Sequence, residues 1–151
     1  MNQIAVVAQT QMLIRRPVSE VFEALIDPEI TSKFWFTKSS GRLEPGKRLK
    51  WDWEMYNVSA EVDVKVVEPN SRIYFHWPYD GASTAVEWVF TRKSDDTTFV
   101  SVTNSGFAGD DARVARAAIS SATGFTFVLA GLKALLEHNL VLNPIGDAHA
   151  G

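Results

Sequence analysis

Five segments between residues 47 and 107 alternate apolar and polar side chains, and short turns separate them. They lie at 47–56, 59–67, 72–77, 84–93 and 97–107. A period of two residues places apolar side chains on one face of a strand and polar side chains on the other. Segments of this kind joined by short turns are typical of antiparallel neighbours with one face in water. The pattern therefore predicts an antiparallel meander.

The residues before the meander predict one more strand and two short helices. Residues 4–14 are strand-like, and a proline at position 17 ends this segment. In 18–27 the apolar residues recur at helical spacing on one face. The next segment, 28–36, begins with a proline at a favourable early helical position. We expect about six strands in all, with both short helices following the first strand.

The end of the chain predicts one long amphipathic helix. Asp110 or Asp111 caps its start and Asn143-Pro144 ends it, either as one helix or as a short helix leading into a long one. The residues expected to face the sheet are Phe125, Val128, Leu129, Leu132, Leu135, Leu136 and Leu140. Those expected to face water are Thr126, Ala130, Lys133 and Glu137. A broad apolar stripe of this kind covers one face of a sheet.

Two glycines, Gly124 and Gly131, interrupt this helix. Each costs about 1 kcal/mol relative to alanine in a helix interior, so each needs a local reason. The reasons are close approach to a strand, a bend, or space for a ligand. Packing is the more common of these.

Composition restricts the class of protein. The chain has 151 residues, 46% of them hydrophobic, which suits a single domain over 1–151. A net charge of -3 without a basic run argues against nucleic acid and against an anionic membrane surface. The longest uncharged run, 117–132, is short and polar for a membrane span. With no cysteine, the chain is expected to be a soluble, cytoplasmic protein.

Motifs for catalysis or metal binding are weak. Residues 41–48 match the spacing of a phosphate-binding loop, but Arg48 replaces the required Ser or Thr, and a strand follows. His76, His138 and His149 lie in different elements and have no metal-ligand spacing. We therefore expect no catalytic residue, no metal and no cofactor.

Aromatic residues are the stronger indication of function, since the chain has five Trp and nine Phe. The candidate wall of an apolar ligand cavity is Trp51, Trp53, Met55, Trp77, Trp88, Phe90, Asn104, Ser121 and Phe125. Each aromatic is equally explained as core. Asn104 continues an apolar strand face, so its amide must find a partner in Ser120, Ser121, Thr123 or a ligand.

The order of these segments resembles the helix-grip fold of the START-like, or SRPBCC, superfamily. Within it the chain is similar to relatives of the C-terminal domain of the heat-shock protein 90 ATPase activator. The matching segments are IRRPVSEVFEALIDPEITSKFWF, GRLEPGKRLKW, VKVVEPNSRIYFHW, TTFVSVTNSGF and GFTFVLAGLKALLEH. The resemblance implies an α+β fold in which a curved antiparallel sheet wraps the long C-terminal helix. It also implies a cavity between the two that takes apolar small molecules.

Three functions remain open. The first is a module that binds an apolar or aromatic small molecule in the cavity between sheet and helix. The second is a protein-interaction module, a chaperone cofactor or a homodimer, that uses exposed Phe34, Trp35 and Phe36. The third is an enzyme of the cyclase, dehydratase or hydrolase kind, which requires inward-pointing titratable groups.

Overall fold

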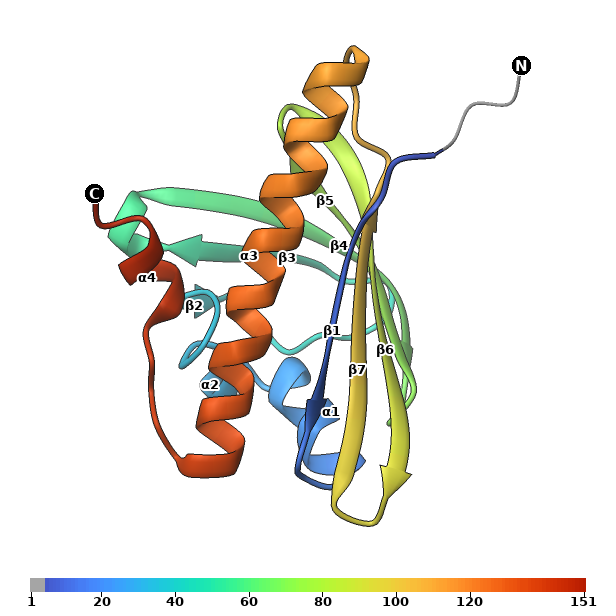
Figure 1. Cartoon of the computed structure of the whole chain (residues 1–151), viewed down its shortest axis with the longest axis vertical. Helices are drawn as coiled ribbons and strands as arrows, with labels where there is room; N and C mark the ends of the chain where they lie inside the picture. Colours follow the sequence, from blue (N-terminus) through green and yellow to red (C-terminus); the bar gives the residue numbers. More distant parts are fainter. Residues whose placement is uncertain (1–4) are drawn as a thin grey trace.

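The computed structural model describes residues 5–151 as a curved antiparallel sheet wrapped around one long helix, which confirms the predicted α+β, helix-grip fold (Figure 1). The elements are β1 (Ala8–Ile14), α1 (Val18–Ile26), α2 (Pro28–Thr31), β2 (Lys38–Ser39), β3 (Arg48–Trp53), η1 (Glu54–Tyr56), β4 (Val58–Glu68), β5 (Arg72–Tyr79), β6 (Ala82–Ser94), β7 (Thr97–Ser105), α3 (Asp111–His138) and α4 (Pro144–Ala148).

The sheet has seven strands in the order β1-β7-β6-β5-β4-β3-β2, all antiparallel. The five predicted strands of the meander are all present. The seventh strand is β2, a two-residue strand that the alternation could not reveal. β1 begins at Ala8 and pairs with β7, from Ala8 opposite Asn104 to Ile14 opposite Thr98; position 4 of the predicted strand lies outside the described residues.

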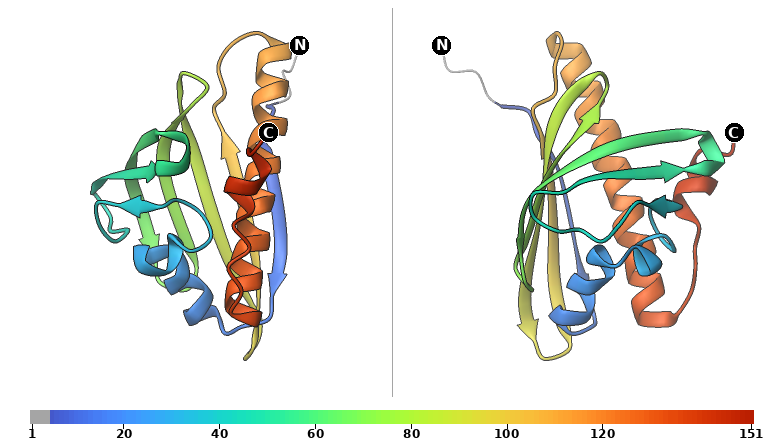
Figure 2. Two further views of the ribbon diagram at one scale, coloured as in Figure 1. Left: turned by 90° about the vertical axis from the view of Figure 1, so that its left-hand side faces the viewer. Right: turned by 180° about the vertical axis from the view of Figure 1, so that it is seen from behind.

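Strong curvature separates the two ends of the sheet. β1 and β7 run along α3, whereas β3 and β4 run across its direction (Figures 1 and 2). A bulge in β4 between Val64 and Val66 contributes to this geometry. The alternation in 59–67 predicts that Val62, Val64 and Val66 share the inner face. For Val66 this is wrong, because the bulge brings Val67 opposite buried Ile73.

The predicted strand 47–56 also ends early. β3 stops at Trp53, and the 3-10 turn η1 follows it. Asn57 closes that turn in the left-handed conformation, with φ of 54°. Met55, predicted to point inward with Trp53, therefore lies on the turn and is 45% exposed.

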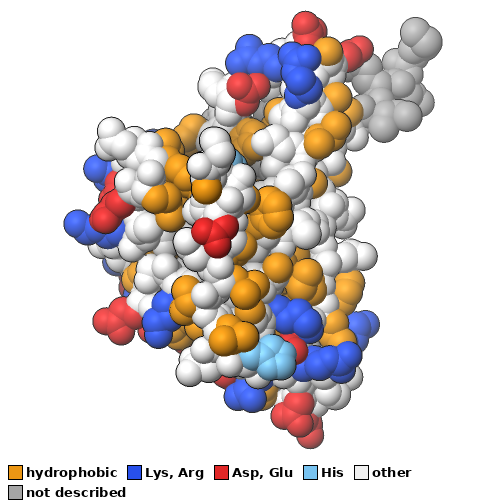
Figure 3. Space-filling model, turned by 60° about the vertical axis from the view of Figure 1, so that its left-hand side comes forward, with side chains coloured by type: hydrophobic (Ala, Val, Ile, Leu, Met, Phe, Trp, Pro, Cys, Tyr) orange, Lys and Arg blue, Asp and Glu red, His pale blue; other side chains and the backbone are white. Residues whose placement is uncertain are grey.

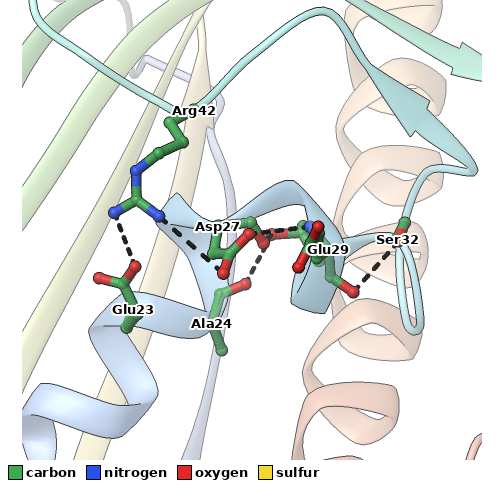
Figure 4. Close-up of polar contacts among 7 residues, drawn as sticks. Glu23, Ala24, Asp27, Glu29, Ser32 and Arg42 are labelled. Atoms are coloured by element: carbon green, nitrogen blue, oxygen red, sulfur yellow. Dashed lines mark hydrogen bonds and ion pairs between the residues drawn. The ribbon is translucent and has the colours of Figure 1, made fainter.

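The two short helices meet at a corner that polar contacts fix (Figure 4). The Asp27 side chain accepts from the Glu29 backbone N–H at 3.0 Å and caps α2. Thr31 Oγ1 donates to the Ala24 carbonyl at 2.6 Å, and Arg42 donates to the Glu23 carboxylate at 2.6 Å. The corner directs the residues after α2 toward the core. Helix α2 itself is shorter than the predicted 28–36.

α3 is a single continuous helix of 28 residues, without a break near Gly124. The Asp110 side chain accepts from the Arg113 backbone N–H at 2.8 Å and caps its start. Asn139 ends it in the left-handed conformation, and the Leu140 N–H donates to the Ala134 carbonyl at 3.1 Å. The predicted inward position of Leu140 is wrong, since the helix has ended and this side chain is 55% exposed.

α3 is long and apolar enough to cross a membrane, with a mean hydropathy of 1.5 over its most apolar window, and it is the one such helix among residues 5–151. In the fold its apolar side chains cover the sheet: Phe125, Val128, Leu129, Leu132 and Leu135 are all buried in the core. It is the core helix of a small soluble domain.

The helix face predicted to meet water borders the edge strand β1: Thr126 is exposed as predicted, whereas Lys133 and Glu137 are partly covered. Thr126 and Thr10 share a hydrogen bond of 2.8 Å between their hydroxyls. Lys133 Nζ donates to the Leu13 carbonyl at 2.8 Å and to Glu137 at 2.6 Å. The Glu137 carboxylate also accepts from the Arg15 backbone N–H at 2.9 Å. The sequence pattern predicts that these residues meet water because their side chains are polar. It does not show that β1 lies beside them.

Glu137 predicts a pH-dependent contribution to stability. Burial raises the pKa of its carboxyl group, but hydrogen bonds from Lys133 and the Arg15 N–H outweigh it, and the pKa lies below its ordinary value. Glu137→Gln should lower the free energy of unfolding by about 1–2 kcal/mol at neutral pH, because hydrogen bonds to charged groups are the stronger ones.

A group with a depressed folded-state pKa contributes stability above its unfolded-state pKa, about 4.3 for Glu, and loses it as the pH falls through the folded-state value. Urea unfolding of both proteins at neutral and acidic pH should therefore show the difference shrinking below about pH 4. Glu54→Gln, at an exposed carboxylate, is the matched control. A difference that stays constant with pH would contradict this account of Glu137.

Candidate ligand cavity

A cavity of about 370 Å³ lies between the first half of α3 and the strands that curve away from it. We call it the α3–β5 cavity. It is lined by Trp35, Trp53, Tyr56, Val58, Ser59, Ala60, Trp77, Pro78, Tyr79, Ser120, Ser121, Gly124, Phe125, Val128, Ile145 and His149. Figure 3 shows this side of the molecule, where hydrophobic side chains reach the surface beside α3 and charged ones gather above them. The volume meets the requirement of a few hundred cubic ångströms for a small-molecule site.

Trp35 forms the centre of the aromatic wall. Its ring lies 4.8 Å from Trp51, 5.8 Å from Trp77, 5.6 Å from Trp88 and 5.7 Å from Phe125, measured between centroids. Three of these four contacts are edge-to-face, the arrangement that ring quadrupoles favour. The residue comes from the corner after α2, so this corner sets the depth of the cavity.

Polar groups occur mainly at the rim. The Tyr56 hydroxyl donates to the Ile145 carbonyl and lies 3.2 Å from His149 Nδ1, which attaches α4 to η1. Burial raises the pKa of Tyr56, and the negative charge of Asp147 adds to this. At the other end of the cavity the Tyr79 hydroxyl donates to Ser120 at 3.0 Å.

Asn104 faces inward, as its strand position predicts, and is fully buried. Its amide nitrogen donates to Thr84 Oγ1 at 2.9 Å and to the Ala85 carbonyl at 2.8 Å. Its amide oxygen accepts from Ser121 at 2.8 Å. Of the helix hydroxyls expected to bond to this amide, Ser121 is the one that does so. Since the protein itself satisfies the amide, Asn104 joins α3 to β6 and does not line the cavity.

The structure divides the remaining predicted site residues into two groups. Trp53, Trp77, Ser121 and Phe125 line the α3–β5 cavity. The others do not: Trp51, Trp88 and Phe90 are at most 4% exposed and belong to the filled core, and Met55 is on the surface. Strand parity identified the inner face correctly, but it cannot tell which inward residues border space and which border other side chains. Ligand binding by the first group stays a prediction.

Several lining residues were missed because they come from irregular segments. Trp35 was expected on the surface with Phe34 and Phe36, as part of an interaction patch. All three are buried, at 6%, 3% and 2% exposed, so this patch does not exist. Ile145 belongs to α4 and His149 directly follows it, and both come after the expected end of the long helix. No periodicity predicts that this segment turns back over the cavity.

The two helix glycines have different explanations. A Cβ atom on Gly131 would lie 3.1 Å from Phe34 Cβ and 3.3 Å from its carbonyl oxygen, so this glycine permits close packing. A Cβ atom on Gly124 would meet nothing within 4 Å. Gly124 lines the cavity, so the missing side chain there leaves open space, whereas at Gly131 it allows another segment to pack closely.

Chemical groups for catalysis are sparse in the cavity. Its lining includes no carboxylate, lysine or arginine from the described residues, and its titratable groups are Tyr56, Tyr79 and His149. Among residues 5–151 no three His, Asp or Glu side chains lie close enough to hold a metal ion. The arrangement therefore suits apolar burial with a few hydrogen bonds.

Comparison with known proteins supports this fold. Residues 15–137 match the family described as activator of Hsp90 ATPase homolog 1-like protein. A protein from Staphylococcus saprophyticus, SSP2350, has 29% identity and a TM-score of 0.78 over 91% of this chain and 96% of its own. No curated protein matches the sequence.

Two more distant structures share the fold at 19% identity. The Aha1 dimer from Colwellia psychrerythraea has a TM-score of 0.73 over 88% of this chain and 97% of its own. The di-domain ARO/CYC BexL from the BE-7585A biosynthetic pathway has a TM-score of 0.76 over 87% of this chain and 46% of its own.

The Asn104 cluster should be a structural unit. Asn104→Ala should lower the free energy of unfolding by about 2–3 kcal/mol, because it removes the amide's bonds to Thr84 and Ala85 and leaves the buried Ser121 hydroxyl without a partner. Ser121→Ala, which removes one hydroxyl, should cost less, about 1 kcal/mol. Denaturant titration measures both. A loss below about 0.5 kcal/mol for Asn104→Ala would show that the amide is dispensable.

The two glycines allow a matched test within one helix. Gly131→Ala should destabilise the protein by about 1–3 kcal/mol, since the new Cβ overpacks against Phe34. Gly124→Ala should stabilise it by about 0.5–1 kcal/mol, because alanine favours the helix and the Cβ meets no atom. Thermal or urea unfolding measures both variants, and equal effects at the two positions would refute the distinction.

Proposed function

Because the chain belongs to the activator of Hsp90 ATPase homologue 1-like family, we propose that it is a binding module for a small apolar or aromatic molecule held in the α3–β5 cavity. The observation that carries the proposal is empty volume inside a wall of large aromatic side chains. The cavity opens to solvent, where Val58 in its lining is 51% exposed, and its volume of about 370 Å³ is of the size that small molecules occupy. Gly124 adds free space to its wall, because a Cβ atom there would meet nothing within 4 Å.

The chemistry of the wall suggests how such a molecule is held. Trp35, Trp53, Trp77 and Phe125 offer ring faces and edges for an apolar or planar body. Hydroxyl groups of Tyr56, Tyr79 and Ser120 at the rim can fix its orientation. This division into an apolar interior and a few polar groups is usual for small-molecule sites.

Protein contact is the second candidate. Its predicted surface is buried, but Leu140, Val141 and Leu142 in the turn after α3 are 46–62% exposed. Three adjacent exposed apolar side chains favour contact with another apolar surface. One structural neighbour is described as an Aha1 dimer. An enzymatic function has less support, because the cavity brings together few titratable groups.

A thermal-shift screen against apolar and aromatic metabolites tests the proposal, with tryptophan emission recorded alongside. A ligand that binds only the folded state, present at a concentration of about 100 times its Kd, should stabilise the protein by about 2.7 kcal/mol. The same ligand should change the emission, since three tryptophans line the cavity.

Gly124→Leu should fill the cavity and lower the affinity for the ligand by about tenfold or more. Gly124→Ala should bind the ligand nearly as well as the natural protein does. Light scattering on the same samples reports any dimer. If the screen finds no ligand, or if Gly124→Leu leaves a ligand's affinity unchanged, the proposal for this cavity is wrong.

A further inference from the structure

We propose that the ligand of the α3–β5 cavity carries an anionic group, such as a carboxylate or sulfonate, and that Arg116 binds this group outside the aromatic wall. The inference rests on the proposed function and specifies the class of ligand. It follows from the polarity of α3 along the cavity.

One stripe of α3 changes from charged to apolar as it enters the cavity. Residues four apart lie on the same helix face, and the stripe reads Arg116, Ser120, Gly124 and Val128. From Arg116 to Gly124 the distance along the helix axis is about 12 Å. The stripe therefore presents a cation, a hydroxyl, free space and an apolar wall in that order, which matches an amphiphile with one polar end.

A second hollow, of about 590 Å³, continues the first at the charged end of this stripe. It is lined by Tyr79, Asp80, Arg113, Arg116, Ala117 and Ser120. Tyr79 and Ser120 belong to both hollows, and the hydrogen bond between their hydroxyls marks the boundary. A molecule seated against Phe125 can extend past this pair to the arginines without crossing the core.

The two arginines of this hollow differ in availability. Arg113 donates to the Asp80 carboxylate at 2.9 Å and to its carbonyl at 3.0 Å. Arg116 has no hydrogen-bond or ion-pair partner among the described residues. Asp80 is the one carboxylate among the described residues that line this hollow; it is ion-paired with Arg113, and the more distant positive charge of Arg116 also lowers the pKa of Asp80. Of the two arginines in the described lining, Arg116 is therefore the one whose guanidinium group is not held by a hydrogen bond and can turn to an incoming anion.

The opposite end of the cavity disfavours an anion. Asp147 lies near Tyr56 and contributes a negative charge to that rim. No arginine or lysine joins the described lining there. The charge distribution thus gives the ligand one orientation, with its anionic end toward Arg116.

A pair of fluorescent probes with the same aromatic body tests the inference. 8-Anilinonaphthalene-1-sulfonate carries a sulfonate, and N-phenyl-1-naphthylamine is the same skeleton without it. Arg116→Gln should weaken binding of the sulfonate probe about fivefold to tenfold, as expected for loss of one partly exposed charged contact. It should change binding of the neutral probe by less than about twofold. Added salt should weaken the binding of the sulfonate probe and leave that of the neutral probe unchanged.

Two further variants make the outcomes decisive. Arg92→Gln removes the same charge at the far end of β6 and should alter neither probe. Gly124→Leu should reduce the binding of both probes. If neither probe binds in a manner sensitive to Gly124→Leu, the proposed function fails. If both bind there but Arg116→Gln leaves the sulfonate probe unchanged, or weakens both equally, the cavity stands and the role of Arg116 is wrong.

Discussion

The contact of Trp35 with the aromatic residues around it is the interaction on which the rest of the structure depends. This side chain joins the corner after α2 to the sheet through Trp51 and Trp88 and to α3 through Phe125. Aromatic pairs contribute about 0.5–1.5 kcal/mol each beyond the burial of their area. Because Trp35 fills the middle of the space under α3, the cavity remains only toward the strands that curve away.

Curvature explains why the core is dense at one end and open at the other. Where β1 and β7 run along α3, Val100 and Val102 pack against the interior and are at most 1% exposed. Where β3 and β4 turn across α3, the sheet departs from the helix, and side chains of ordinary size no longer reach it. Gly124 enlarges this gap, and α4 closes part of its rim through Tyr56.

The sequence allowed most of the fold to be predicted because its signals are local. Alternation identified the strands and the inward position of Asn104, and helical spacing identified the core residues of α3. Features that depend on non-local geometry were not accessible. The bulge in β4 moved Val67 into the place expected for Val66, and β1 covered the polar face of α3 around Lys133.

Site prediction was limited by the same cause. Trp53 and Trp88 have the same strand parity, yet one borders the cavity and the other the filled core. Which of them meets space depends on the curvature of the sheet and on Trp35, which reaches the interior from a turn. Only positions at which the pattern was locally unfavourable, such as glycine inside a helix, carried a signal of the cavity.

The hydrogen bonds between α3 and β1 also constrain the order of folding. Lys133 and Leu13 are 120 residues apart, so this contact forms only after nearly the whole domain has been synthesised. Strand β1 lacks its partner β7 until residues 97–105 have emerged, and the long helix covers the apolar face of the sheet only after residues 111–138 follow. Closure of such distant segments is slow compared with local contacts. The nascent chain therefore passes through a period in which a large aromatic surface is open to water and to other chains.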